Sequence, residues 1–121
     1  MKYLCLAYGI QKEMEALSKS EFEALLVKCR VHDEELKKSG HLVSGQSLEW
    51  TAMSIRRKNG RVVVTDGPFV ETKEQIGGLV VIEAKDLNEA IRIAKLHPAA
   101  HLGERQGWGI EVRPIADGCH Q

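Results

Sequence analysis

Apolar residues follow two different periods along the chain, and the change from one period to the other predicts the order of elements. Residues 2–8 are fairly apolar on both faces of an extended strand, and residues 78–84 contain a continuous apolar run. Between these two segments, a stripe of side chains recurs every three or four residues, which predicts a helix. The stripe consists of Phe22, Leu25, Leu26, Cys29, His32 and Leu36. A second helix and a strand over residues 109–115 complete the pattern.

Both predicted helices carry boundary signals. Ser18 and Glu21 fit a capping box at the start of the first helix, and Gly40 suits the left-handed position after its end. Asp86 is placed to cap the second helix, and Pro98 to end it. The two helices therefore have defined limits in the sequence itself.

The middle of the chain predicts strands and a hairpin. Residues 41–49 predict a weaker strand with a bulge or bend, and residues 51–57 and 61–65 flank Asn59–Gly60, which favours a type I′ turn. The order is β-α-β-β-β-β-α-β, without a linker or repeat. We expect one α+β domain over residues 1–121, a ferredoxin-like sandwich with both helices on one face of a mostly antiparallel sheet.

That arrangement leaves the other face of the sheet uncovered, although several strands are apolar on both sides. A stable monomer rarely exposes an apolar surface of that size. The sequence therefore predicts a homodimer in which two sheets face each other across a two-fold axis.

Composition narrows the classes of partner. Lysine plus arginine and aspartate plus glutamate both number 17, so the chain has no net charge to attract nucleic acid or anionic membranes. No apolar run is long enough for a membrane span. Three cysteines (Cys5, Cys29 and Cys119) form no motif, which favours a reduced, cytoplasmic protein in which Cys5 and Cys29 are small core residues.

The segment over residues 66–78 carries more charge and glycine than a strand connection needs. It contains Asp66-Gly67-Pro68-Phe69, then Glu71, Lys73-Glu74 and Gly77-Gly78. These residues resemble the signature of the DGPF-domain proteins, a branch of the YCII-related superfamily. The start of the second helix and the closing Ile110–Ile115 segment fit the same pattern.

The resemblance implies a dimeric α+β barrel of ferredoxin-like halves, and most members have no established activity. For the wider group, a helix histidine and an aspartate are candidate catalytic residues. The resemblance implies His32 and Asp66 as that pair in this chain. Alternatively, Asp66 only fixes the turn before Gly67-Pro68, and His32 is a buried residue with one hydrogen-bond partner.

Four further residues are candidates for substrate binding. Glu111 and Arg113 project from one strand face, where Arg113 can bind a carboxylate or pair with Glu111. Phe69 and Lys73 belong to the motif beside Asp66, although Lys73 and its acidic neighbours equally fit a structural charge cluster. We predict no metal site and no cofactor, because the chain lacks the nucleotide-binding and zinc motifs.

Two functions remain open from the sequence. The first is the binding of a small, anionic organic molecule in the barrel cavity, with isomerase or lyase chemistry in which Asp66 moves a proton. The second is a non-catalytic ligand-binding or regulatory protein linked to transcription.

Overall fold

A computed structural model describes residues 1–116 and 118, so Cys119 lies outside the described residues. The elements in chain order are strand β1 (Lys2–Ile10), helices α1 (Gln11–Glu15) and α2 (Lys19–Lys38), strands β2 (Leu42–Ser47), β3 (Met53–Lys58), β4 (Arg61–Asp66) and β5 (Glu74–Glu83), helix α3 (Leu87–Ala94), the 3-10 turn η1 (Pro98–Ala100) and strand β6 (Gly109–Pro114). This order confirms the predicted succession of strands and adds the short helix α1 and the turn η1.

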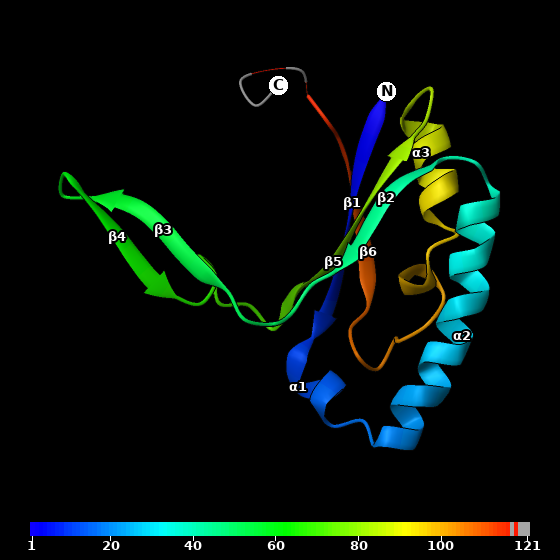
Figure 1. Cartoon of the computed structure of the whole chain (residues 1–121), viewed down its shortest axis with the longest axis horizontal. Helices are drawn as coiled ribbons and strands as arrows, with labels where there is room; N and C mark the ends of the chain where they lie inside the picture. The colour runs from blue at the N-terminus through cyan, green and yellow to red at the C-terminus, as the bar shows by residue number, and fades with distance from the viewer. Residues whose placement is uncertain (117, 119–121) are drawn as a thin grey trace.

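Four strands form the main sheet in the order β2-β5-β1-β6, and every neighbouring pair is antiparallel. Helices α2 and α3 both lie on one face of this sheet (Figure 1). The predicted α+β class, with both helices on one face, is therefore confirmed. The dimeric barrel remains a prediction, because the structure contains one chain.

The core lies between that face of the sheet and the helices. Tyr3 and Cys5 of β1 are buried there, beside Val80 and Ile82 of β5. Burial raises the pKa of the Cys5 thiol to about 11, so Cys5 stays protonated and behaves as a small apolar residue. Side chains alternate along a strand, so the residues between these four point to the opposite, open face.

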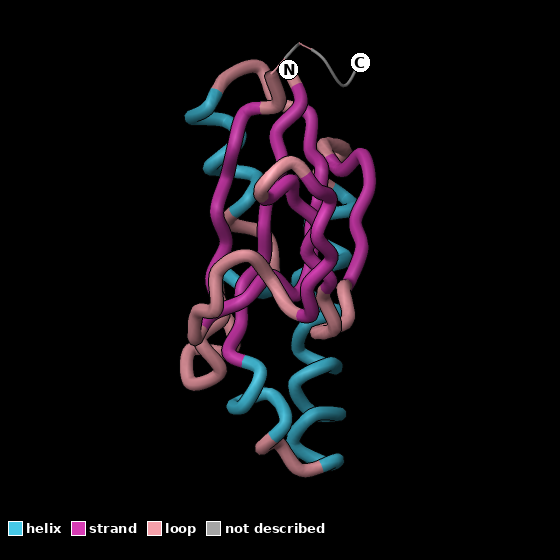
Figure 2. Tube along the Cα trace, turned by 90° about the vertical axis from the view of Figure 1, so that its left-hand side faces the viewer, coloured by secondary structure: helices cyan, strands magenta, loops and turns pink. Residues whose placement is uncertain are grey.

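Strands β3 and β4 do not extend the main sheet. They pair only with each other, and the hairpin stands out from the body of the chain on the side of the open face (Figure 1). Asn59 and Gly60 have φ values of 52° and 78°, as the predicted type I′ turn requires. Figure 2, turned by 90°, shows the hairpin in front of the sheet.

Strand β5 begins at Glu74, four residues before the strand predicted over 78–84. Strand β1 reaches Ile10, which pairs with Glu74, so the backbone ladder continues through part of the charged motif. The register shifts opposite Ala7 and Tyr8, where Gly77 is the extra residue. Backbone pairing with a long neighbouring strand overrides the polar side chains here, and part of the predicted loop is strand.

Both predicted helix caps are present. The Glu21 N–H donates to Ser18 Oγ at 3.1 Å, and the Ser18 N–H donates to Glu21 Oε1 at 2.9 Å, which completes the capping box. The hydrogen bond from the Ser18 N–H to the carboxylate, followed by the effect of the Ser18 side chain, lowers the pKa of Glu21. Gly40, with φ of 78°, follows the end of α2 as predicted.

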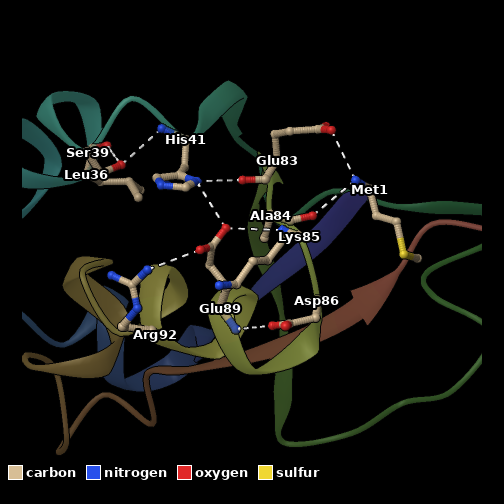
Figure 3. Close-up of polar contacts among 10 residues, drawn as sticks. All are labelled: Met1, Leu36, Ser39, His41, Glu83, Ala84, Lys85, Asp86, Glu89 and Arg92. Carbon is tan, nitrogen blue, oxygen red and sulfur yellow. Dashed lines mark hydrogen bonds and ion pairs between the residues drawn. The ribbon is translucent and has the colours of Figure 1, made fainter.

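The start of α3 joins the beginning of the chain and the loop after α2 (Figure 3). The Glu89 N–H donates to Asp86 Oδ1 at 2.8 Å, which caps the helix. The Met1 amino group donates to the Ala84 carbonyl oxygen at 3.0 Å, and His41 Nδ1 lies 3.9 Å from Glu89 Oε1. These contacts fix one end of the sandwich.

Among residues 1–116 and 118, no helix has the length and apolar character needed to cross a membrane.

Candidate functional site

A pocket of about 490 Å³ lies between α2 and the helix-covered face of the sheet. Its wall is mainly apolar, with α2 contributing residues such as Leu25 and Leu26, and the indole rings of Trp50 and Trp108 lining it as well. A pocket of this size and character fits a small organic ligand. It differs from the cavity expected from the sequence, which was to lie between two sheets of a dimer.

Three glycines let the two indole rings approach the backbone closely. A Cβ atom at Gly77 would lie 3.4 Å from Trp50 Cη2, and one at Gly9 would lie 3.3 Å from Trp108 Cδ1. A Cβ atom at Gly103 would overlap the Trp108 ring, whose Cε3 atom would be only 2.6 Å away. The glycines therefore shape the pocket, and the Gly77 of the charged motif is one of them.

Trp108 is held in place by a polar contact as well as by packing. Its Nε1–H donates to the Met14 sulfur at 3.1 Å, which connects the pocket wall to the end of α1. The short helix that the sequence did not predict therefore supports one side of the pocket.

His97 lines the pocket at the start of η1, and its Nδ1 accepts a hydrogen bond from the Ala99 N–H at 2.9 Å. Because Nδ1 is an acceptor, a neutral ring carries its proton on Nε2. Burial lowers the pKa of His97, and the negative charge of Asp33 opposes this effect. The ring is therefore held as a neutral imidazole whose Nε2–H can donate.

Asp33 enters the same pocket from α2, one residue after the predicted catalytic histidine. It is the one formally charged side chain among the described residues that line the pocket. Burial, and secondly the charge of Asp33, raise the pKa of the nearby Cys29 thiol, so this cysteine stays protonated. Asp33 and His97, 64 positions apart in sequence, thus place a carboxylate and an imidazole in the lining of one mainly apolar pocket.

Asp66 lies elsewhere, at the end of β4, with an exposed side chain. The corner after it is fixed by the Gly67 N–H, which donates to the Ala52 carbonyl oxygen at 2.8 Å, and by the Ser54 hydroxyl, which donates to the Gly67 carbonyl oxygen. Within residues 1–116 and 118, the structure gives the Asp66 carboxylate no hydrogen bond of its own.

His32 lies on α2 but outside the pocket lining. Its ring stacks on that of His101, with centroids 4.7 Å apart and planes 8° from parallel. Its buried Nδ1 has no hydrogen-bond partner in the described part of the chain. Figure 1 places α2 and β4 on opposite sides of the main sheet, so one chain does not bring His32 and Asp66 together. Their proposed pairing stays a prediction.

The four predicted binding residues also lie outside the pocket. Arg113 Nε donates to Glu111 Oε2 at 2.8 Å on the open face of the sheet, and this hydrogen bond, followed by the Glu111 charge, raises the pKa of Arg113. The exposed ring of Phe69 packs under the Arg56 guanidinium, whose carbon lies 4.6 Å from the ring centroid. Lys73 is exposed.

Sequence reasoning missed Asp33, His97 and both tryptophans. The signal for His97 was its place directly before Pro98, where its side chain caps η1. In the described ranges 1–116 and 118, no group of three or more His, Cys, Asp or Glu side chains is arranged to hold a metal ion. Among the described residues that line the pocket, the His, Cys, Asp and Glu side chains are Cys29, Asp33 and His97.

Comparisons with known proteins show the family of the chain. The model of the YCII-related domain matches residues 1–116. The chain belongs to the YCII-related family. An uncharacterised protein of Rhizobium meliloti (strain 1021) is 32% identical to this YCII-related chain over 118 residues, which cover 96% of this chain and 93% of the relative. Membership in the DGPF branch stays a prediction from residues 66–69.

Two solved structures resemble the YCII-related chain. The first is 5-chloro-2-hydroxyhydroquinone dehydrochlorinase (TftG) from Burkholderia phenoliruptrix AC1100 in complex with 2,5-dihydroxybenzoquinone, with 14% identity, a TM-score of 0.50, and coverage of 99% of this chain and 98% of TftG. The second is the de novo designed protein Ferredog-Diesel, with 13% identity, a TM-score of 0.41, and coverage of 94% and 85%. The likeness to TftG shows a shared fold.

Proposed function

We propose that this YCII-related protein binds a small organic ring compound in the pocket between α2 and the sheet, and moves a proton on it without a cofactor. The observation that carries this proposal is that a neutral His97 imidazole and the Asp33 carboxylate line the same mainly apolar pocket of about 490 Å³. A carboxylate and an imidazole in an apolar site are suited to acid–base chemistry.

The two groups have different roles in this proposal. With Nδ1 occupied by the Ala99 N–H, His97 offers Nε2–H to a carbonyl oxygen of the ligand and stabilises the negative charge that develops there. Asp33 takes the proton from the neighbouring carbon. The proton can then return at another carbon, which is an isomerisation, or a leaving group can depart, which is a lyase reaction. The apolar wall strengthens both interactions by excluding water.

Charge at the pocket defines the ligand class. Asp33 is the one formal charge in its described lining, so an anionic ligand is disfavoured there and a neutral ring compound with a carbonyl or hydroxyl group fits better. Arg113, the anion-binding candidate from the sequence, lies on the open face and is paired with Glu111. The bound compound in the TftG structure, 2,5-dihydroxybenzoquinone, is also a small ring compound, which supports this size class for a chain of the same fold.

The homodimer is part of the proposal. It covers the open sheet face, and it is the setting in which Asp66 of one copy can approach groups of the other. The sequence-predicted pair, Asp66 with His32, is kept as the competing assignment of the acid and base.

Exchange of carbon-bound protons tests the function and the competing assignment together. Small cyclic ketones are incubated with the protein in D₂O, and deuterium uptake beside the carbonyl is followed by NMR. We expect uptake with the wild type, loss of it in Asp33→Asn and His97→Gln, and retention in Asp66→Asn and His32→Gln. The reverse pattern would transfer the chemistry to Asp66 and His32.

Binding measured on the same compounds separates an enzyme from a binding protein. Saturable quenching of the fluorescence of Trp50 and Trp108 would report occupancy of the pocket, since the chain has two tryptophans and both line it. Quenching without deuterium uptake would support the non-catalytic, ligand-binding alternative. The absence of both quenching and deuterium uptake, across neutral cyclic ketones and phenols, would contradict the proposal.

A further inference from the structure

The β3–β4 hairpin, residues 53–66, is a protruding arm with one apolar face. Cross-strand pairing places Ile55 opposite Val64, Arg57 opposite Val62 and Met53 opposite Asp66, so these side chains share one face. The four apolar members of this face are strongly exposed: Met53 at 57%, Ile55 at 61%, Val62 at 69% and Val64 at 59%. A contiguous apolar face on an extended arm marks an interaction surface.

The arm has little support from its own chain. At its base, the Gly67 N–H donates to the Ala52 carbonyl oxygen and the Ser54 hydroxyl donates to the Gly67 carbonyl oxygen, and Arg56 contacts the Phe69 ring. A two-stranded hairpin without a packed face is marginally stable in water. The apolar face therefore needs a partner surface if the arm is to keep this conformation.

The open face of the main sheet is a second apolar surface, which neither α2 nor α3 covers and whose side chains are partly exposed, and it lies on the same side of the molecule. Leu4 pairs with Val81 and Leu6 pairs with Leu79, and all four alternate with the buried core residues of β1 and β5. Figure 1 shows the arm leaving the body on this side of the sheet, and Figure 2 shows it in front of the strands. A body that packs on the open face would also meet the arm.

The distribution of charge over the chain bears on which partner packs against the open face and the arm. The arm holds four of the chain's 17 Lys and Arg residues (Arg56, Arg57, Lys58 and Arg61) and one of its 17 Asp and Glu residues, so it carries a net charge of +3. The rest of the chain has 13 basic and 16 acidic residues, a net charge of −3. The arm of one copy is therefore complementary in charge to the body of another, while the whole chain is neutral.

We propose that the β3–β4 arm is a clasp that packs its apolar face against the body of a second copy of this chain. This inference rests on the homodimer proposed above and names the element that holds it together. In a two-fold dimer, each copy contributes one arm and receives one, so both uncovered apolar surfaces of each chain become buried.

Two neighbouring substitutions test the clasp. Val64→Asp places a carboxylate on the apolar face, whereas Thr65→Asp places the same charge on the other face of the same strand, opposite Ser54. Both side chains are exposed in the single chain, so neither substitution removes a core contact. Sedimentation equilibrium over a range of concentrations measures the mass in solution, and a monomer has the chain mass of 13.5 kDa.

We expect the wild type and Thr65→Asp to form dimers, and Val64→Asp to raise the dimer dissociation constant by about 100-fold or more, because the lost apolar burial occurs twice in a two-fold interface. A wild-type dimer that Val64→Asp leaves intact would overturn the clasp and leave the homodimer standing. A monomeric wild type, or equal weakening by both variants, would also overturn it. A monomer that still binds a ring compound would overturn the clasp but would not contradict the proposed ligand binding in the pocket between α2 and the sheet.

Hydrogen exchange provides a second readout of the same inference. Backbone amides of residues 53–66 should be protected at concentrations where the dimer forms, and should lose protection on dilution together with the fall in mass. Protection that is the same in monomer and dimer would contradict the clasp.

Discussion

Replacing Gly103 by alanine should destabilise the chain through the Trp108 side of the pocket. Gly103 has a φ of 69°, and a Cβ atom there would overlap the indole ring, with Cε3 at only 2.6 Å. The left-handed conformation costs an alanine about 1–2 kcal/mol. Overpacking against the partly buried Trp108 ring adds about 1–3 kcal/mol. The expected loss in the free energy of unfolding is therefore about 2–5 kcal/mol.

Gly40→Ala is the matched control. Gly40 has a φ of 78°, but no atom lies within 4 Å of the position that its Cβ would occupy. The free energy of unfolding of Gly40→Ala should fall only by the cost of the left-handed backbone conformation, about 1–2 kcal/mol. The difference between the two variants, about 1–3 kcal/mol, isolates the cost of displacing Trp108.

Urea unfolding followed by circular dichroism measures both losses on one scale. Gly103→Ala should also change the fluorescence of the folded state, because Trp108 must move away from Met14 and the pocket wall. Equal losses in Gly103→Ala and Gly40→Ala, with unchanged fluorescence, would refute the argument that Gly103 is required by the indole ring.

Two further predictions concern a helix cap and pH. Asp86→Ala should lower the free energy of unfolding by about 1 kcal/mol, because the Glu89 N–H loses its acceptor. Asp86→Asn should retain most of the wild-type stability, because asparagine also caps helices. Urea unfolding compares the two variants with the wild type. The pKa of His97 lies below the ordinary 6.5, so the unfolded chain binds more protons: stability should be full above pH 6.5 and fall as pH drops toward the lowered pKa. His97→Gln should show a smaller fall than the wild type in thermal unfolding across that range; an identical fall would contradict the assignment.

Local signals in the sequence predicted most of the fold. Ser18 with Glu21, Asp86 and the Asn59–Gly60 turn each act through contacts within a few residues, so their structural roles follow from local chemistry. The apolar periods likewise predicted the buried face of α2, with Cys29 and Leu36, and the strand β5. What the pattern could not show is that β3 and β4 leave the sheet, because an alternating strand looks the same whether or not its apolar face packs on the core of its own chain.

The site was harder to predict because its parts are distant in sequence. Asp33 and His97 line one pocket only because α2 and η1 both lie against the same face of the sheet. The charged motif around Asp66 attracted attention by its composition, but its glycine at position 77 serves Trp50 at the pocket, while its carboxylate lies on an exposed arm. A pairing of each tryptophan with a glycine distant in sequence cannot be found from spacing alone.

The most direct test of the pocket is an NMR titration of the two indole N–H signals. The chain has two tryptophans, both at the pocket, so a ¹⁵N-labelled sample gives one Nε1–H signal for Trp50 and one for Trp108. On addition of cyclohexanone or phenol, the account predicts that both signals shift saturably in the wild type and shift less in Asp33→Asn and His97→Gln. Unmoved indole signals, with shifts confined to the amides of residues 66–73, would contradict it and place the ligand at the charged motif.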